Sequence, residues 1–97
     1  IMSWEEGWKH HQKSIRTEKR HYKENRDKLM ADPQFKGQFV AIVDTEIQGP
    51  YHDRYLAMSE GIVFADSLSK RSVFVTRVGD EEEEEKIQKA FIQKLFE

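Results

Sequence analysis

Four carboxylates in the middle of the chain have the side-chain type that acid–base catalysis uses: Asp44, Glu46, Asp53 and Glu60. A catalytic acid and base must both reach the reacting group, and spacing along the chain does not establish that. Asp44 and Glu46 also fit an acidic turn between two strands. The chain has no Walker loop, no Gly-x-Ser-x-Gly elbow and no dinucleotide-binding glycine pattern. We therefore predict that the protein is not an enzyme, and a site centred on Asp44 and Glu46 stays as a third alternative.

A metal site is the next possibility, and four histidines are available for it: His10, His11, His21 and His52. No two of them have the i, i+4 spacing of a zinc-binding helix. Glu18 and His21 form a Glu-x-x-His pair of the kind used in di-iron helices. Lys19 and Arg20 lie between them and would repel a cation. We predict no metal and no cofactor.

Charge is distributed unevenly along a chain whose net charge is only −2. Between residues 9 and 28 there are eight Lys or Arg against three Asp or Glu, whereas residues 80–85 are all acidic. A basic helix with interleaved aromatic side chains can follow a phosphate backbone, so nucleic-acid binding is the alternative function. Its candidate residues are Lys13, Arg16, Lys19, Arg20, Lys23 and Arg26. The acidic run either begins a helix, where negative charge is favoured, or pairs with the basic helix of the same chain or a neighbour.

Large apolar side chains near both ends of the chain suggest a surface for another protein. Tryptophan is common at interface hot spots, and an apolar helix face wider than a monomer can cover favours a homodimer. The candidate partner-binding residues are Trp4, Trp8, Ile15, Tyr22, Phe91, Leu95 and Phe96. We expect a protein partner or a second copy of the chain to bind there.

The first element that must position these residues is a helix over residues 3–31. Ser3 has the capping-box spacing to Glu6, and a seam of apolar residues recurs every seven positions. Asp32 precedes Pro33, which disfavours helix and ends the element. The seam consists of Trp8, Ile15, Tyr22 and Leu29.

The middle of the chain predicts a small sheet with one helix. Residues 39–43 are apolar on both faces, which is typical of a central strand covered on at least one side by helices. A second short strand begins at Ile47 and ends at Gly49-Pro50, and residues 72–79 alternate as a third strand. Residues 52–68 predict a helix whose buried stripe is Tyr55, Met58, Ile62 and Ala65, although 61–66 also fit a strand.

The last element is a helix over residues 80–97, capped by Asp80 with Glu83 at the capping-box position. The fold class is therefore α+β: a three-stranded sheet with a ββαβ core over 35–79, flanked by a long N-terminal helix and a C-terminal helix in one domain of 97 residues.

Two segments of this core resemble a short prokaryotic family known only as a domain of unknown function. They are Gly37-Gln38-Phe39-Val40-Ala41-Ile42 and Phe74-Val75-Thr76-Arg77-Val78-Gly79. Gln38 stands where the family usually has lysine, and Thr45 where its turn commonly has glycine. The resemblance covers residues 35–79 and implies the fold alone, with no activity, cofactor or catalytic residue.

These patterns lead to one functional prediction: a non-catalytic protein–protein interaction or assembly module that self-associates through its terminal helices. The chain has no apolar run long enough to cross a membrane, and its start does not resemble a secretion signal. It has no cysteine, which fits a reducing compartment. We expect a cytoplasmic protein that does not bind membranes.

Overall fold

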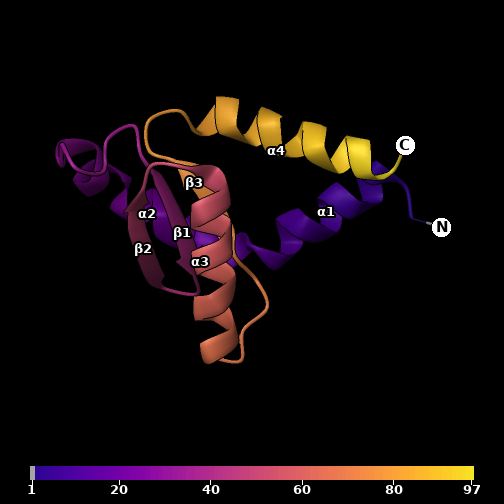
Figure 1. The fold of residues 1–97 in the computed structure, drawn as a ribbon, viewed down its shortest axis with the longest axis horizontal. Coiled ribbons are helices and arrows are strands. Elements are labelled where there is room, and N and C mark those ends of the chain that lie inside the picture. The colour runs from indigo at the N-terminus through magenta and orange to yellow at the C-terminus, as the bar shows by residue number, and fades with distance from the viewer. Residues whose placement is uncertain (1) are drawn as a thin grey trace.

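A computed structural model describes residues 2–97 and confirms the α+β class, with four helices and a three-stranded antiparallel sheet among these residues (Figure 1). The strands lie in the order β2-β1-β3. In chain order the elements are α1 (Trp4–Ser14), α2 (Arg16–Ala31), β1 (Phe39–Val43), β2 (Glu46–Tyr51), α3 (Arg54–Ser67), β3 (Phe74–Arg77) and α4 (Glu81–Leu95).

The central strand β1 is buried along its whole length because a helix covers each face of the sheet. Phe39, Ala41 and Val43 face α3, whereas Val40 and Ile42 face α2. Alternate residues of a strand point to opposite faces, so an unbroken apolar run fits this position. The prediction of a central strand covered by helices is confirmed.

Helices α1 and α4 extend beyond the β3 edge of the sheet and pack against each other (Figure 1). Residues 2 and 97 therefore lie at the same end of the molecule. Helix α4 contacts the sheet through β3, where the Gln88 side-chain amide donates to the Val75 carbonyl oxygen at 2.8 Å. The two terminal helices form an arm attached to one edge of the sheet.

The predicted single helix over 3–31 is two helices that meet at Ile15, whose backbone leaves helical geometry at φ −104°, ψ 15°. Ser14 donates its hydroxyl to the His11 carbonyl oxygen at 2.8 Å, a local bond that bends helices. Ile15 is only 1% exposed, so the bend brings α2 onto the sheet while α1 continues to α4. The predicted Ser3 cap is present, with the Glu6 N–H donating to the Ser3 hydroxyl.

Strand β2 continues through Gly49 and Pro50, so the prediction that it ends there is wrong. Proline is tolerated because β2 is an edge strand whose outer N–H groups need no partner. The register between Phe39 and Ala41 shifts by a bulge opposite this segment. Helix α4 also differs at its start, since the Asp80 side chain makes no capping bond and the Gly79 N–H donates to Glu81 Oε2 at 3.1 Å.

Residues 61–66 are helical, and the inner face of α3 is Ala57, Gly61 and Ala65. The predicted buried stripe is therefore confirmed at Ala65 and in part at Met58, which packs against the core, but it is wrong at Tyr55 and Ile62. Tyr55 and Ile62 are 62% and 52% exposed. Small side chains let the helix approach the sheet closely. A Cβ on Gly61 would lie 2.6 Å from Val73 Cγ1, so the helix sits where only glycine fits.

Replacing Gly61 by alanine is expected to lower the free energy of unfolding by about 1 kcal/mol, because overpacking costs about 2 kcal/mol and alanine regains only about 1 kcal/mol of helix propensity. Urea unfolding measures this change. The control is Ser59→Ala on the exposed face of the same helix, which should be neutral or slightly stabilising. Equal or higher stability of Gly61→Ala would show that the close approach is absent.

Candidate functional site

The carboxylates considered for catalysis are spread over the domain. Asp44 lies at the β1–β2 turn and pairs with Lys70 at 3.9 Å, whereas Asp53 accepts the Tyr55 and Leu56 N–H groups as the cap of α3. Glu60 is exposed on the outer face of α3. Within residues 2–97, no three His, Asp or Glu side chains are grouped as a metal ion would require. Of the four carboxylates, Asp44 and Glu46 therefore lie at the same β1–β2 turn, whereas Asp53 and Glu60 belong to the start and the outer side of α3.

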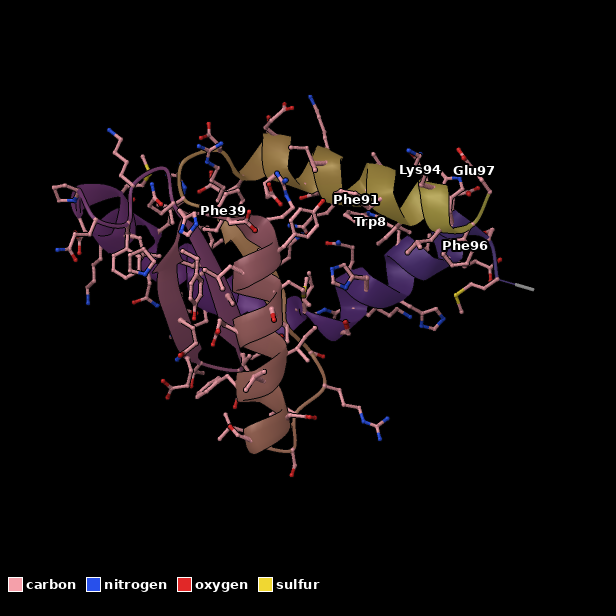
Figure 2. All side chains as sticks on the ribbon, viewed as in Figure 1. Trp8, Phe39, Phe91, Lys94, Phe96 and Glu97 are labelled. Atoms are coloured by element: carbon pink, nitrogen blue, oxygen red, sulfur yellow. The ribbon has the colours of Figure 1, made fainter. Side chains whose placement is uncertain are left out.

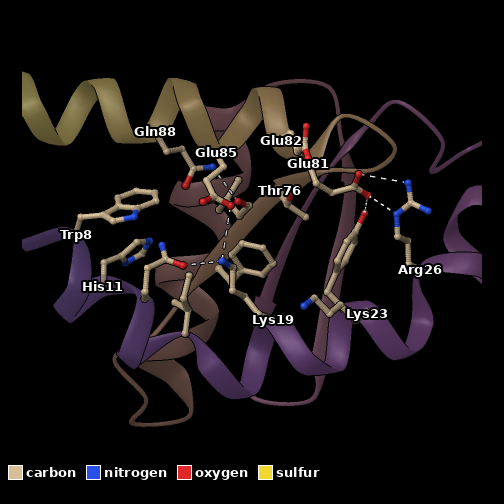
Figure 3. Close-up of a pocket in the computed structure, with 15 residues that line it drawn as sticks. Trp8, His11, Lys19, Lys23, Arg26, Thr76, Glu81, Glu82, Glu85 and Gln88 are labelled. Carbon is tan, nitrogen blue, oxygen red and sulfur yellow. Dashed lines mark hydrogen bonds and ion pairs between the residues drawn. The ribbon is translucent and has the colours of Figure 1, made fainter. Parts of the chain in front are cut away.

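A cleft of 420 Å³ lies between α2 and α4 along β3, and its two walls carry opposite charge (Figure 3). Three cations lie on the α2 side and three acids on the α4 side: Lys19, Lys23 and Arg26 opposite Glu81, Glu82 and Glu85. Arg26 Nε lies 2.8 Å from Glu81 Oε2, and Lys19 Nζ lies 3.7 Å from Glu85 Oε2. The basic helix and the acidic run therefore pair within one chain, which is one of the two arrangements the sequence left open.

The Arg26 end of this cleft is a hydrogen-bonded network around Glu81. Tyr22 donates its hydroxyl to Glu81, and the pKa of Tyr22 is raised first by burial and then by that bond. Burial alone would raise the pKa of Glu81, but hydrogen bonds from Arg26, Tyr22 and the Gly79 N–H lower it to about 2. The network holds the start of α4 against α2.

The Glu81 network is expected to lose its contribution to stability in acid. Because the folded-state pKa of Glu81 is about 2 against an ordinary 4.5, the contribution is complete above pH 4.5 and is lost as the pH falls toward 2. Urea unfolding of the wild type and Glu81→Gln should differ at pH 7 and converge at about pH 2. The difference in the free energy of unfolding isolates Glu81 from the other carboxylates. A difference that is the same at both pH values would contradict the network.

A second cavity, of 240 Å³, opens between α1, α3 and α4, and its lining is mainly apolar. Tyr55 and Phe91 meet there edge to face, with ring centroids 6.2 Å apart. Met58 and Ile92 also line it. His11 borders both cavities, and its pKa is lowered by burial and then by the nearby Lys19.

Beyond this cavity the apolar surface continues over the outside of α3 and along α4. We call it the α3–α4 surface. Its members, with their exposed fractions, are Tyr55 62%, Leu56 38%, Ile62 52%, Val63 65%, Phe91 44% and Leu95 81%. Phe91 and Leu95 are one turn apart and share a face of α4. Figure 2 shows Phe91 beneath α4, between that helix and the rest of the fold. Exposed apolar patches of this kind mark interaction sites.

The seven residues predicted to bind a partner fall into three groups. Phe91 and Leu95 belong to the α3–α4 surface. Ile15 and Tyr22 are 1% and 4% exposed, so their side chains belong to the interior and are not available to a partner in this conformation. They are buried because the apolar seam of the N-terminal segment packs onto the sheet and onto the start of α4.

The remaining three, Trp4, Trp8 and Phe96, hold the arm together. Lys89 Nζ lies 5.8 Å from the Trp4 ring centroid and 5.7 Å from that of Trp8, which is cation–π range. The Phe96 ring lies over Gly7, where an added Cβ would be 3.1 Å from it. Figure 2 shows Trp8 between α1 and α4 and Phe96 where the two helices converge. The tryptophans therefore contact α4 of their own chain.

The six cations proposed for nucleic acid are also divided by the structure. Lys13, Arg16, Arg20 and Lys23 are exposed. Lys19 and Arg26 are paired with Glu85 and Glu81. Acidic side chains thus neutralise part of the positive field that phosphate binding needs.

Two buried carboxylates were not predicted from the sequence. Glu18 is 6% exposed and its Oε2 accepts the Asp44 N–H at 2.7 Å, which fixes the β1–β2 turn where Asp44 has φ 57°. Glu84 is 2% exposed and accepts hydrogen bonds from the Arg54 guanidinium, the shortest 2.8 Å long. Each carboxylate binds a residue that is distant in the sequence, so no local sequence pattern predicts these two pairs.

The exposed apolar face of α3 was also not predicted as a candidate site. Its seven-residue spacings, Tyr55 to Ile62 and Leu56 to Val63, are nevertheless present in the sequence. Tyr55 and Ile62 were assigned to the buried stripe.

Searches of family models, curated proteins and solved structures find no match to this chain. The resemblance to an uncharacterised prokaryotic family stays a prediction. Within residues 2–97, no helix has the length and apolar content to cross a bilayer.

Proposed function

We propose that this domain is a non-catalytic protein–protein interaction module whose binding site is the α3–α4 surface. The observation that carries the proposal is the outer face of α3, which exposes Tyr55, Leu56, Ile62 and Val63 to water. The solvent face of a surface helix normally carries charged and polar residues. A helix that is apolar on both its inner and its outer face is suited to burial on both sides.

The neighbouring α4 supports the same site. Its only buried residue is Glu84, and Leu95 is 81% exposed. The Tyr55–Phe91 contact joins the two helices into one continuous apolar surface. Charged side chains border it, including Glu60 and Asp66 on α3 and Lys94 on α4, as at the polar rim of an interface.

Leu95→Asp tests the proposal in a capture experiment from the native source. A protein bound through this surface should be recovered by the wild-type domain and lost with the variant, since hot-spot changes of about 2 kcal/mol weaken binding roughly 30-fold. Thr17→Asp, an exposed position on α2, is the matched control and should bind like the wild type. An identical set of bound proteins for all three domains would overturn the proposal.

A further inference from the structure

The apolar residues of the outer α3 face are arranged symmetrically about Ser59. Tyr55 and Leu56 lie one turn before it, and Ile62 and Val63 lie one turn after it. At 100° per residue, Ser59 is at the middle of the exposed face, with Tyr55 and Ile62 on one side and Leu56 and Val63 on the other. A small side chain is therefore surrounded by four apolar ones, all exposed.

We propose that the α3–α4 surface binds a second copy of this chain, with the two α3 helices antiparallel about a two-fold axis at Ser59. The inference rests on the proposed function and names its partner. A two-fold interface uses the same patch on both subunits, so the patch must complement itself. Here Tyr55 meets Ile62 of the partner subunit, Leu56 meets Val63 of the partner subunit, and the two Ser59 residues allow the helices to approach closely.

The charge of Asp66 favours the antiparallel arrangement over a parallel one. Asp66 lies seven residues from Ser59, which is about 10 Å along the helix axis. Antiparallel helices therefore place the two Asp66 carboxylates about 20 Å apart. A parallel pair would put them side by side, and like charges in contact oppose association.

Helix α4 enlarges the contact at the Tyr55 end. Phe91 meets Tyr55 edge to face, and Tyr55 packs beside Ile62 of the partner subunit, so Phe91 lies at the same seam. From their exposed fractions, the six side chains of the surface offer on the order of 400 Å² of apolar area. A standard interface buries about 800 Å² per partner, of which a little over half is apolar. The apolar area of the surface is therefore close to that of a standard interface.

Ser59→Cys tests the geometry directly, because the chain has no cysteine of its own. Two residues on the two-fold axis of closely packed helices come within the Cα separation of about 4.4–6.8 Å that a disulfide requires. Under mild oxidation the variant should form a covalent dimer in high yield. Ser67→Cys is the matched control on the same helix: its two copies would be about 24 Å apart and should not cross-link.

The outcome separates this inference from the proposed function. A wild-type chain that stays monomeric over the whole concentration range, or a dimer in which Ser59→Cys does not cross-link preferentially over Ser67→Cys, overturns the second-copy arrangement. If Leu95→Asp still abolishes capture of another protein in that case, the interaction module stands with a different partner. If neither effect appears, both proposals fail.

Discussion

Arg54→Met is expected to lower the free energy of unfolding by about 3–5 kcal/mol, the largest effect of any single change considered for this domain. Arg54 Nε and Nη2 donate to the Glu84 carboxylate, which is 2% exposed. Removing the guanidinium leaves a buried charge whose remaining bond comes from the Gln88 amide at 2.8 Å. Urea unfolding at pH 7 measures the loss. Small domains have about 5–15 kcal/mol of stability in total, so part of this variant should be unfolded at moderate temperature.

The double variant Arg54→Met, Glu84→Leu is the control for the first prediction. It removes both charges and keeps an apolar contact between α3 and α4, so it should recover most of the lost stability. If the double variant is as unstable as Arg54→Met, the loss comes from the contact between the Arg54 guanidinium and Phe39, whose ring centroid lies 5.4 Å from the guanidinium carbon. A single-variant loss below about 1 kcal/mol would mean that the pair is effectively solvated.

Ile15→Ala is the second change with a large expected effect, and it should lower the free energy of unfolding by about 3 kcal/mol. The Ile15 side chain is 1% exposed, so its truncation leaves a cavity in the interior. Ile15 lies where α1 and α2 meet, so the change should also loosen the arm. The matched control is Leu95→Ala, another aliphatic truncation, at a side chain that is 81% exposed. The control should cost under about 0.5 kcal/mol of stability. Similar losses for both variants would contradict the division between interior and free surface.

The sheet was predictable from the sequence because its signal is local. Residues 39–43 are apolar on both faces and residues 73–78 alternate between the α3 and α2 sides, so strand positions follow from side-chain period alone. The seam Ile15, Tyr22 and Leu29 was also predictable, and all three residues are buried. The bend at Ile15 was not, since the seven-residue spacing continues unchanged through it.

Of the inner face of α3, Ala65 was predicted to be buried, whereas Ala57 and Gly61 were not, because small residues give a weak hydrophobic pattern. Ala57, Gly61 and Ala65 carry little hydrophobic signal, whereas Tyr55 and Ile62 carry much more and were assigned to the interior. The sheet selects the small residues because it lies too close for larger ones at Gly61. Because Tyr55 and Ile62 were assigned to the interior, the candidate site was not predicted. These large apolar side chains of α3 point away from the fold.

Buried charge was the other feature that sequence patterns did not reveal. Glu18 and Glu84 occupy positions that look like ordinary solvated helix residues, and their partners lie 26 and 30 residues away. Only the packing of α2 against the β1–β2 turn and of α4 against α3 brings these groups together.

The position of the two tryptophans was also not predictable. Trp4 and Trp8 were predicted to bind a partner, because the sequence does not show that α4 folds back along α1.

Sedimentation of the wild-type domain and of Val63→Asp over a concentration series is the most direct test of recognition through the α3–α4 surface by a second copy. We predict a wild-type dimer at high concentration and a monomeric variant with an unchanged urea midpoint in the dilute limit. Val63 is 65% exposed, so the substitution leaves the interior of the monomer intact. A wild-type monomer at every concentration, or a dimer that Val63→Asp does not weaken, would contradict the account.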